Sequence, residues 1–328
     1  MATGVFFPTH GIRMPPDFYY GKIKMTLTAT QKLFAKPLTA ALAALLLACA
    51  APAWADDHAQ FQQGYTAYQA GNYAQALRLW QPLAQKGNAE AQFALGLMYD
   101  KGQGVAKNDR QAAAWYQKAA NQGDADAQLN LGLMYANGRG VAKNYRQAAA
   151  WWQKAADQGD AEAQYNLGLM YDNGRGVAKN YRQAAAWYQK AADQGNADAQ
   201  YNLGLMYYNG QGVAQNYRQA AAWYQKAANQ GDAAAQFNLG LMYDNGQGVA
   251  QNDRQAAAWY QKAANQGHAK AQYNLGVMYY NGQGMARNYR QAAAWYKKVL
   301  AQPDTPENAE AKALARENLQ GLSKRGVR

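Results

Sequence analysis

The chain has little of the residue types that build disulfides, metal sites and covalent catalysis. Of its 328 residues only one is cysteine, Cys49, and three are histidine. Beyond residue 55 the one serine is Ser323, and the threonines are Thr66 and Thr305. This inventory excludes a disulfide framework, the usual zinc patterns and any nucleophile–base pair in the repeated part of the chain. We therefore expect no catalytic residue, no metal site and no cofactor.

Proline and β-branched residues are also scarce, whereas alanine and glutamine are abundant. Beyond residue 55, proline occurs only at Pro82, Pro303 and Pro306. Such a composition favours helix over strand. The chain is basic, with 33 Lys and Arg against 21 Asp and Glu.

The first 55 residues differ from the rest and read as a targeting segment. An apolar run from Leu38 to Ala53 follows two lysines and ends in a small-residue cleavage pattern before Asp56. The run is too short for a membrane span. We predict a signal peptide over residues 25–55, with cleavage after Ala55, a true start at Met25 and a mis-annotated extension over residues 1–24. The alternative is a lipoprotein signal, in which Cys49 carries the lipid.

A 36-residue unit repeats almost unchanged through the rest of the chain. Leu-Gly-Leu-Met-Tyr begins at Leu95, Leu131, Leu167, Leu203 and Leu239, and Leu-Gly-Val-Met-Tyr begins at Leu275. Arg-Gln-Ala-Ala-Ala-Trp begins at Arg110, Arg146, Arg182, Arg218, Arg254 and Arg290. A unit this short cannot bury its own apolar face, so neighbouring units must stack.

Each unit predicts two helices joined by a glycine-containing loop. In the unit over residues 89–124, apolar residues at helical spacing place a first helix from Ala89 to Asp100. Gly102 and Gly104 break it by adopting positive φ, and Asn108 or Asp109 caps the second helix. That helix presents Ala112, Trp115, Tyr116 and Ala119 to the core, with Trp115 as a main filling residue. Gly96 indicates close approach of a neighbouring helix. The fold class is all-α, a superhelical solenoid of antiparallel helix pairs.

The units resemble the Sel-one-like repeat, a 36-residue relative of the tetratricopeptide repeat. The resemblance is carried by Ala91, Leu95, Gly96, Tyr99, Gly102, Gly104, Val105, Ala112, Trp115, Lys118, Ala119, Ala120 and Gly123. It spans six repeats over residues 89–304. Residues 56–88 are predicted to be a degenerate first repeat. Residues 305–328 are predicted to be a capping helix from Pro306 to Gln320, ended by Gly321, and a basic tail.

Two sets of residues on the first helices are candidates for partner binding. One is an asparagine ladder, whose amides could hold an extended peptide backbone: Asn130, Asn166, Asn202, Asn238 and Asn274. The other is an aromatic groove: Tyr165, Tyr201, Tyr208, Tyr273 and Tyr280. The alternative for both sets is contact with the helices of adjacent units.

A third candidate is a stretch of loop edge that is more basic than the others. Its residues are Arg139, Lys143, Arg146, Arg175, Lys179 and Arg182. This basic edge could meet an acidic protein, lipid phosphates or an anionic glycan, and the alternative is a plain solvated face.

The resemblance implies a protein–protein interaction scaffold, with roles in envelope assembly, secretion or host contact. We expect an exported, periplasmic monomer that binds a protein or peptide partner and does not bind nucleic acid. Two alternatives stay open. One is an enzyme or binding protein acting on cell-wall material, since cysteine-rich relatives are linked to β-lactam binding. The other is a surface-exposed factor that binds host proteins.

Overall fold

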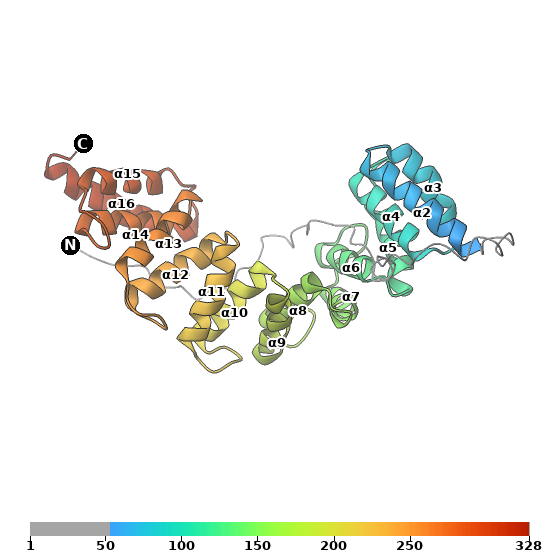
Figure 1. Cartoon of the computed structure of the whole chain (residues 1–328), viewed down its shortest axis with the longest axis horizontal. Helices are drawn as coiled ribbons and strands as arrows, with labels where there is room; N and C mark the ends of the chain where they lie inside the picture. The colour runs from blue at the N-terminus through green and yellow to red at the C-terminus, as the bar shows by residue number, and fades with distance from the viewer. Residues whose placement is uncertain (1–52, 328) are drawn as a thin grey trace, which may run out of the picture. The chain divides into compact units, whose positions relative to one another are not determined.

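The computed structural model describes residues 53–327 as helices joined by short loops, with no strand in that range (Figure 1). The signal peptide, the alternative start and Cys49 lie outside the described residues, apart from the predicted cleavage site in the first turn of the first helix. None of the helices in that range has the length and apolarity of a membrane span.

The helices alternate between first and second members of each repeat. The first helices are α2 (Ala53–Gln69), α4 (Ala89–Lys101), α6 (Ala125–Asn137), α8 (Ala161–Asn173), α10 (Ala197–Asn209), α12 (Ala233–Asn245) and α14 (Ala269–Asn281). The second helices are α3 (Tyr73–Gln85), α5 (Asp109–Asn121), α7 (Tyr145–Asp157), α9 (Tyr181–Asp193), α11 (Tyr217–Asn229), α13 (Asp253–Asn265) and α15 (Tyr289–Leu300). A last helix, α16 (Pro306–Lys324), follows them.

The chain forms two compact units. One unit holds residues 53–163 and 175–177, and the other holds residues 164–174 and 178–327. Within each unit, a first helix packs against its own second helix, and a second helix packs against the first helix of the following repeat. The all-α class and the repeated antiparallel pairs predicted from the sequence are confirmed.

Helix ends follow the predicted signals. Gly102 ends α4 at φ +70° and Gly104 adopts φ +73°, so both glycines supply the left-handed backbone of the loop. The Asn108 side chain accepts a hydrogen bond from the backbone N–H of Gln111 at 3.1 Å, and Asp124 caps the next first helix through Ala127 N–H at 2.7 Å. At the equivalent junction His268 is a cap too, because its Nδ1 accepts from Ala271 N–H.

The core lies between the two helices of each repeat. The Tyr116 ring is fully buried and covers Gly96, where a β-carbon would lie 2.5 Å from that ring. The small residue is therefore needed beneath an aromatic ring of the second helix. Trp115, which the sequence favoured as the main filling residue, lies only partly buried at the edge, beneath the Lys118 ammonium at 3.9 Å.

Glutamine side chains tie successive helices together, a feature that sequence reasoning did not find. Gln200 is 4% exposed, and its Nε2 donates to the carbonyl oxygen of Ala192 in the preceding second helix at 3.0 Å. Its Oε1 accepts from Gln230 Nε2 at 2.8 Å, and Gln230 also donates to the Gly195 carbonyl. The same pattern recurs at Gln128 and Gln236, and it satisfies backbone groups at helix C-termini.

The C-terminal helix covers the last repeat. Ala311, Ala315 and Leu322 of α16 are buried against α14 and α15. The helix extends to Lys324, so the prediction that Gly321 ends it is wrong: Gly321 is helical, and Gly326 carries the positive φ of +77°.

Candidate partner-binding surfaces

The asparagine ladder lies inside the packed repeats. Its five members are only 1–5% exposed, with Asn202 at 1%. The Asn130 amide donates to the Asp126 carbonyl at 2.7 Å. Burial raises the pKa of Tyr188 well above its usual range. The amide of Asn202, in the following first helix, lies at the Tyr188 hydroxyl and lowers that pKa. Asn238 and Asn274 face the hydroxyls of Tyr224 and Tyr260 in the same way.

The predicted accessibility of these asparagines is therefore contradicted. Helices α6, α10, α12 and α14 each lie between their own second helix and that of the preceding repeat, and an extended peptide cannot reach amides covered by both. The alternative, contact with neighbouring helices, describes the ladder, so these amides are not available to a partner.

The aromatic groove is also absent as an open surface. Tyr165, Tyr201 and Tyr273 are 7%, 7% and 0% exposed, respectively. Their rings pair with second-helix tyrosines at centroid distances of 5.9, 5.8 and 5.7 Å. Ring pairs at this distance stabilise a core. These three tyrosines are core residues and are not available to a partner.

The other two tyrosines of that set are partly buried in loop contacts. Tyr208 donates from its hydroxyl to Gln247 Oε1 at 3.0 Å. The Arg325 guanidinium lies over the Tyr280 ring, 5.7 Å from its centroid. Both tyrosines serve contacts within the chain.

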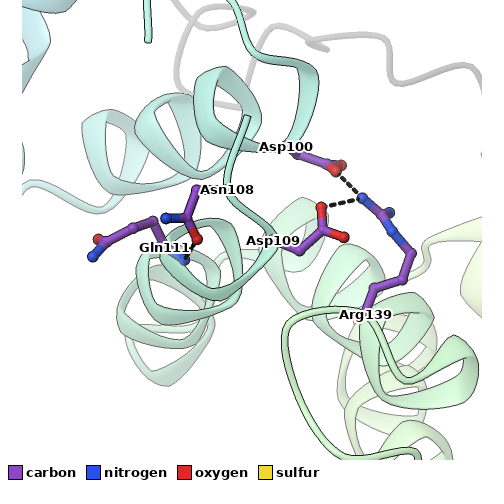
Figure 2. Close-up of polar contacts among 5 residues, drawn as sticks. All are labelled: Asp100, Asn108, Asp109, Gln111 and Arg139. Atoms are coloured by element: carbon purple, nitrogen blue, oxygen red, sulfur yellow. Dashed lines mark hydrogen bonds and ion pairs between the residues drawn. The ribbon is translucent and has the colours of Figure 1, made fainter. Parts of the chain in front are cut away.

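Arg139 of the basic edge forms ion pairs inside the fold (Figure 2). Its guanidinium contacts Asp100, and it lies 2.8 Å from Asp109. Burial and the charge of Asp109 raise the pKa of Asp100 to about 6. The guanidinium opposes that shift, because it stabilises the ionised carboxylate. The charge of Arg139 is thus used in ion pairs within the chain and is not available to a partner.

The remaining residues of the basic edge are exposed: Lys143, Arg146, Arg175, Lys179 and Arg182. Lys143 and Arg175 share the Tyr145 ring, at 5.1 and 5.6 Å from its centroid. Lys179 lies over Tyr181 at 4.7 Å. These contacts hold the cations at the surface without neutralising them.

Cationic side chains also follow the second helices within each compact unit, and sequence reasoning missed them. Each of α5, α7, α9, α11, α13 and α15 exposes an arginine in its first turn and a lysine eight residues later, on the same helix face. We call this set the cationic face: Arg110, Lys118, Arg146, Lys154, Arg182, Lys190, Arg218, Lys226, Arg254, Lys262, Arg290 and Lys298. None of them forms an ion pair with another residue in the range 56–327.

The lysines of the cationic face are held in place by tryptophan. Lys190, Lys226 and Lys262 lie 4.0, 3.8 and 3.8 Å above the indole centroids of Trp187, Trp223 and Trp259. A cation over an indole ring is stabilised by roughly 0.5–1 kcal/mol at an exposed site. The signal in the sequence was the fixed spacing of Arg, Trp and Lys in every unit.

Among the described residues, no group of three or more His, Cys, Asp or Glu side chains could hold a metal ion. What the described surface offers is charge at regular intervals, which suits binding to a partner of opposite charge.

Comparison with known proteins identifies the repeat. A model described as the Sel1 repeat matches residues 59–88, 89–124, 125–160, 161–196, 197–232, 233–268 and 269–302. A solved Sel1 repeat protein from Oxalobacter formigenes is 36% identical, with 75% of this chain and 98% of that protein covered and a TM-score of 0.65.

A second solved structure is c5321, described as a protective antigen of uropathogenic Escherichia coli with an SLR fold. It is 37% identical over 76% of this chain, with a TM-score of 0.70, and this chain spans 52% of its length. No curated protein matches this chain.

Proposed function

Because this chain belongs to the Sel1 repeat family, whose members are protein-interaction scaffolds and generally not enzymes, we propose that it is an exported scaffold that binds an acidic segment of a protein partner through the cationic face. The resemblance places such a role in envelope assembly, secretion or host contact. The targeting pattern before Asp56 supports export.

The observation that carries this proposal is the distribution of accessible side chains. The first helices are buried on nearly every side, from Ala91 to Met98 in α4 and at the equivalent positions of α6, α10, α12 and α14. The second helices keep one open face, and its charged residues are mainly cations. A partner that meets this open face encounters two cations in each of the six repeats from residue 89 onward, so acidic side chains complement it.

The regularity of the cationic face supports a protein segment that follows several repeats. Each repeat contributes a weak contact, because an exposed ion pair stabilises by only about 0–1 kcal/mol. Affinity then depends on how many repeats are engaged together.

Crosslinking capture from the native cell envelope tests the proposal. Lys190, Lys226 and Lys262 are changed to Gln in one variant, and Lys101, Lys107 and Lys324 in a control that loses the same charge. We expect the first variant to lose most of its captured partner and the control to retain it. Equal capture by both variants contradicts the proposal.

Two further measurements separate the parts of the proposal. Capture that survives protease treatment of the envelope extract indicates a glycan or lipid and contradicts a protein partner. Mass spectrometry of the mature N-terminus tests export: a chain beginning at Asp56 supports cleavage of the signal peptide, and a lipidated Cys49 supports the anchored alternative.

A further inference from the structure

The residue between the two loop glycines lies against the preceding repeat. We call it the loop residue, and its members are Gln103, Arg139, Arg175, Gln211, Gln247 and Gln283. The second glycine fixes its place: a β-carbon at Gly140 would lie 2.0 Å from the carbonyl oxygen of Asp109. At Gly212 and Gly284 the equivalent distances to the carbonyls of Tyr181 and Asp253 are 2.2 and 2.3 Å. The backbone therefore holds every loop residue at the start of the preceding second helix.

Each loop residue faces two positions of the preceding repeat. They are the last-but-one residue of its first helix and the first residue of its second helix, which we call the junction pair. Asp100 and Asp109 form one junction pair. The others are Tyr68 with Tyr73, Ala136 with Tyr145, Asp172 with Tyr181, Tyr208 with Tyr217, Asp244 with Asp253, and Tyr280 with Tyr289.

Two junction pairs of tyrosines meet glutamine. The Tyr68 hydroxyl donates to Gln103 Oε1, and Gln103 Nε2 donates to the Tyr73 hydroxyl at 2.9 Å. At the second such pair Tyr208 donates to Gln247 Oε1 at 3.0 Å. The rings of the two pairs lie 5.2 and 5.1 Å apart at nearly the same angle, 64° and 61°. A side-chain amide, which both donates and accepts, suits two phenols.

Junction pairs that suit a cation meet arginine. Arg139 bridges Asp100 and Asp109, as Figure 2 shows. Arg175 has no acid at its junction pair and lies over the Tyr145 ring instead. A planar guanidinium serves both purposes, because it forms ion pairs with carboxylates and stacks on aromatic faces.

The last repeat has no following loop, and the C-terminal tail supplies the missing contact. Tyr280 and Tyr289 lie 5.2 Å apart, like the other tyrosine pairs, and Arg325 covers Tyr280. Arg325-Gly326-Val327 repeats the local sequence Arg139-Gly140-Val141. Gly326 also adopts positive φ, at +77° against +66° for Gly140.

Two junction pairs do not follow this pattern. Asp172 and Tyr181, one acid and one phenol, meet Gln211, and Asp244 and Asp253 meet Gln283. Asp244 and Asp253 match the pair that Arg139 bridges, but their loop residue is Gln283. No bond joins Gln283 to either acid, and its Oε1 accepts from Asn281 instead. Burial raises the pKa of Asp244, and the carboxylate of Asp253 raises it further, whereas the hydrogen bond from Tyr260 lowers it.

We propose that the loop residue is a specificity determinant that recognises the junction pair of the preceding repeat, so that the match between the two sets how stably successive repeats pack. Glutamine selects two tyrosines, and arginine selects two aspartates or an open tyrosine ring. Neighbouring repeats are otherwise almost identical, so this contact distinguishes one junction from another.

Correcting the mismatch tests the proposal in the full chain. Gln283→Arg supplies the cation that Asp244 and Asp253 lack, and Gln255→Arg adds the same charge on the exposed face of α13. We expect Gln283→Arg to raise the melting temperature at pH 7.5 by about 2–4 °C and the control to change it little. The gain must vanish in an Asp253→Asn background, where the pair of carboxylates is lost.

The reverse change completes the design. Arg139→Gln removes the bridge and Arg146→Gln removes an exposed cation, so the first must lower the melting temperature at pH 7.5 and the second must not. A Gln283→Arg variant no more stable than Gln255→Arg overturns the proposal. A gain that persists in the Asp253→Asn background also overturns it, because recognition of the two aspartates then plays no part.

Discussion

The ring of Tyr188 lies on the α-carbon of Gly168, so that a β-carbon at residue 168 would come within 2.6 Å of the ring. The two residues belong to the first and second helices of one repeat. Gly204 and Gly240 lie beneath Tyr224 and Tyr260 in the same way. The repeat therefore stacks an aromatic ring directly on a helix backbone. Only glycine permits that contact, because any β-carbon at this position would clash with the ring.

Replacing that glycine tests the contact. Gly168→Ala should lower the free energy of unfolding by about 1–3 kcal/mol through overpacking, although alanine is the better helix former by about 1 kcal/mol. The control is Gly321→Ala in α16, where no atom lies within 4 Å of the added carbon and φ is not positive. That change should raise stability in urea unfolding. A gain from both substitutions contradicts the packing described here.

Adjacent aromatic residues should differ in their cost on truncation. Tyr116 is fully buried, whereas Trp115 is only partly buried at the edge of the core. Tyr116→Ala should therefore cost about 3–5 kcal/mol, and Trp115→Ala clearly less. Chemical denaturation of both variants measures the difference. A larger loss for Trp115→Ala would restore the assignment made from sequence.

Asp172 should make stability depend on pH. The residue is 1% exposed, and burial raises its pKa to about 6, despite a hydrogen bond from the Tyr188 hydroxyl at 3.2 Å. Because the folded-state pKa lies above the unfolded value, the protonated form favours folding, and that contribution is lost as pH rises through 6.

Asp172→Asn should therefore melt higher than the parent above pH 6, and the difference should disappear below about pH 4. Thermal unfolding across this range measures it. The exposed Asp193, changed in the same way, should give a much smaller effect. A variant less stable than the parent at pH 8 rules out an energetic cost of the buried carboxylate.

The glutamine contacts between helices should contribute to stability. Gln200→Ala leaves the Ala192 carbonyl and the Gln230 amide without this partner, which should cost about 1–3 kcal/mol. Gln225 donates to Asn229 at the surface, so Gln225→Ala should change stability by less than about 0.5 kcal/mol. Equal losses of unfolding free energy for the two variants in urea would show that the hydrogen bonds of Gln200 stabilise the fold no more than the surface bond of Gln225.

Local sequence signals were sufficient for the helices of the repeats and their ends, although not for the end of α16. The 36-residue period, Asn108 as a cap and the loop glycines 102 and 104 act within a few residues, so propensity and capping place them. Local signals did not show which of Trp115 and Tyr116 fills the core, because both side chains suit the apolar face of the helix. The position of Gly96 beneath the second helix decides that choice, and it is a tertiary relationship.

The predictions of the asparagine ladder and the aromatic groove were wrong for the same reason, because they too depend on tertiary packing. Asn202 and Tyr201 recur at regular spacing whether they line a groove or pack against neighbours, and only the placement of two second helices shows that they are buried. Arg139 resembled its exposed neighbours in sequence, but its partners lie 30 and 39 residues away. The cationic face was readable in principle, since arginine and lysine at i and i+8 share one side of a helix.

Amine acetylation in the presence of the captured partner tests the cationic face most directly. Acetylation of each lysine is read by mass spectrometry, with and without the partner bound. Lys190, Lys226 and Lys262 should lose reactivity in the complex, while Lys101 and Lys324 keep theirs. Unchanged reactivity of the three second-helix lysines, with the partner demonstrably bound, contradicts the assignment of this face.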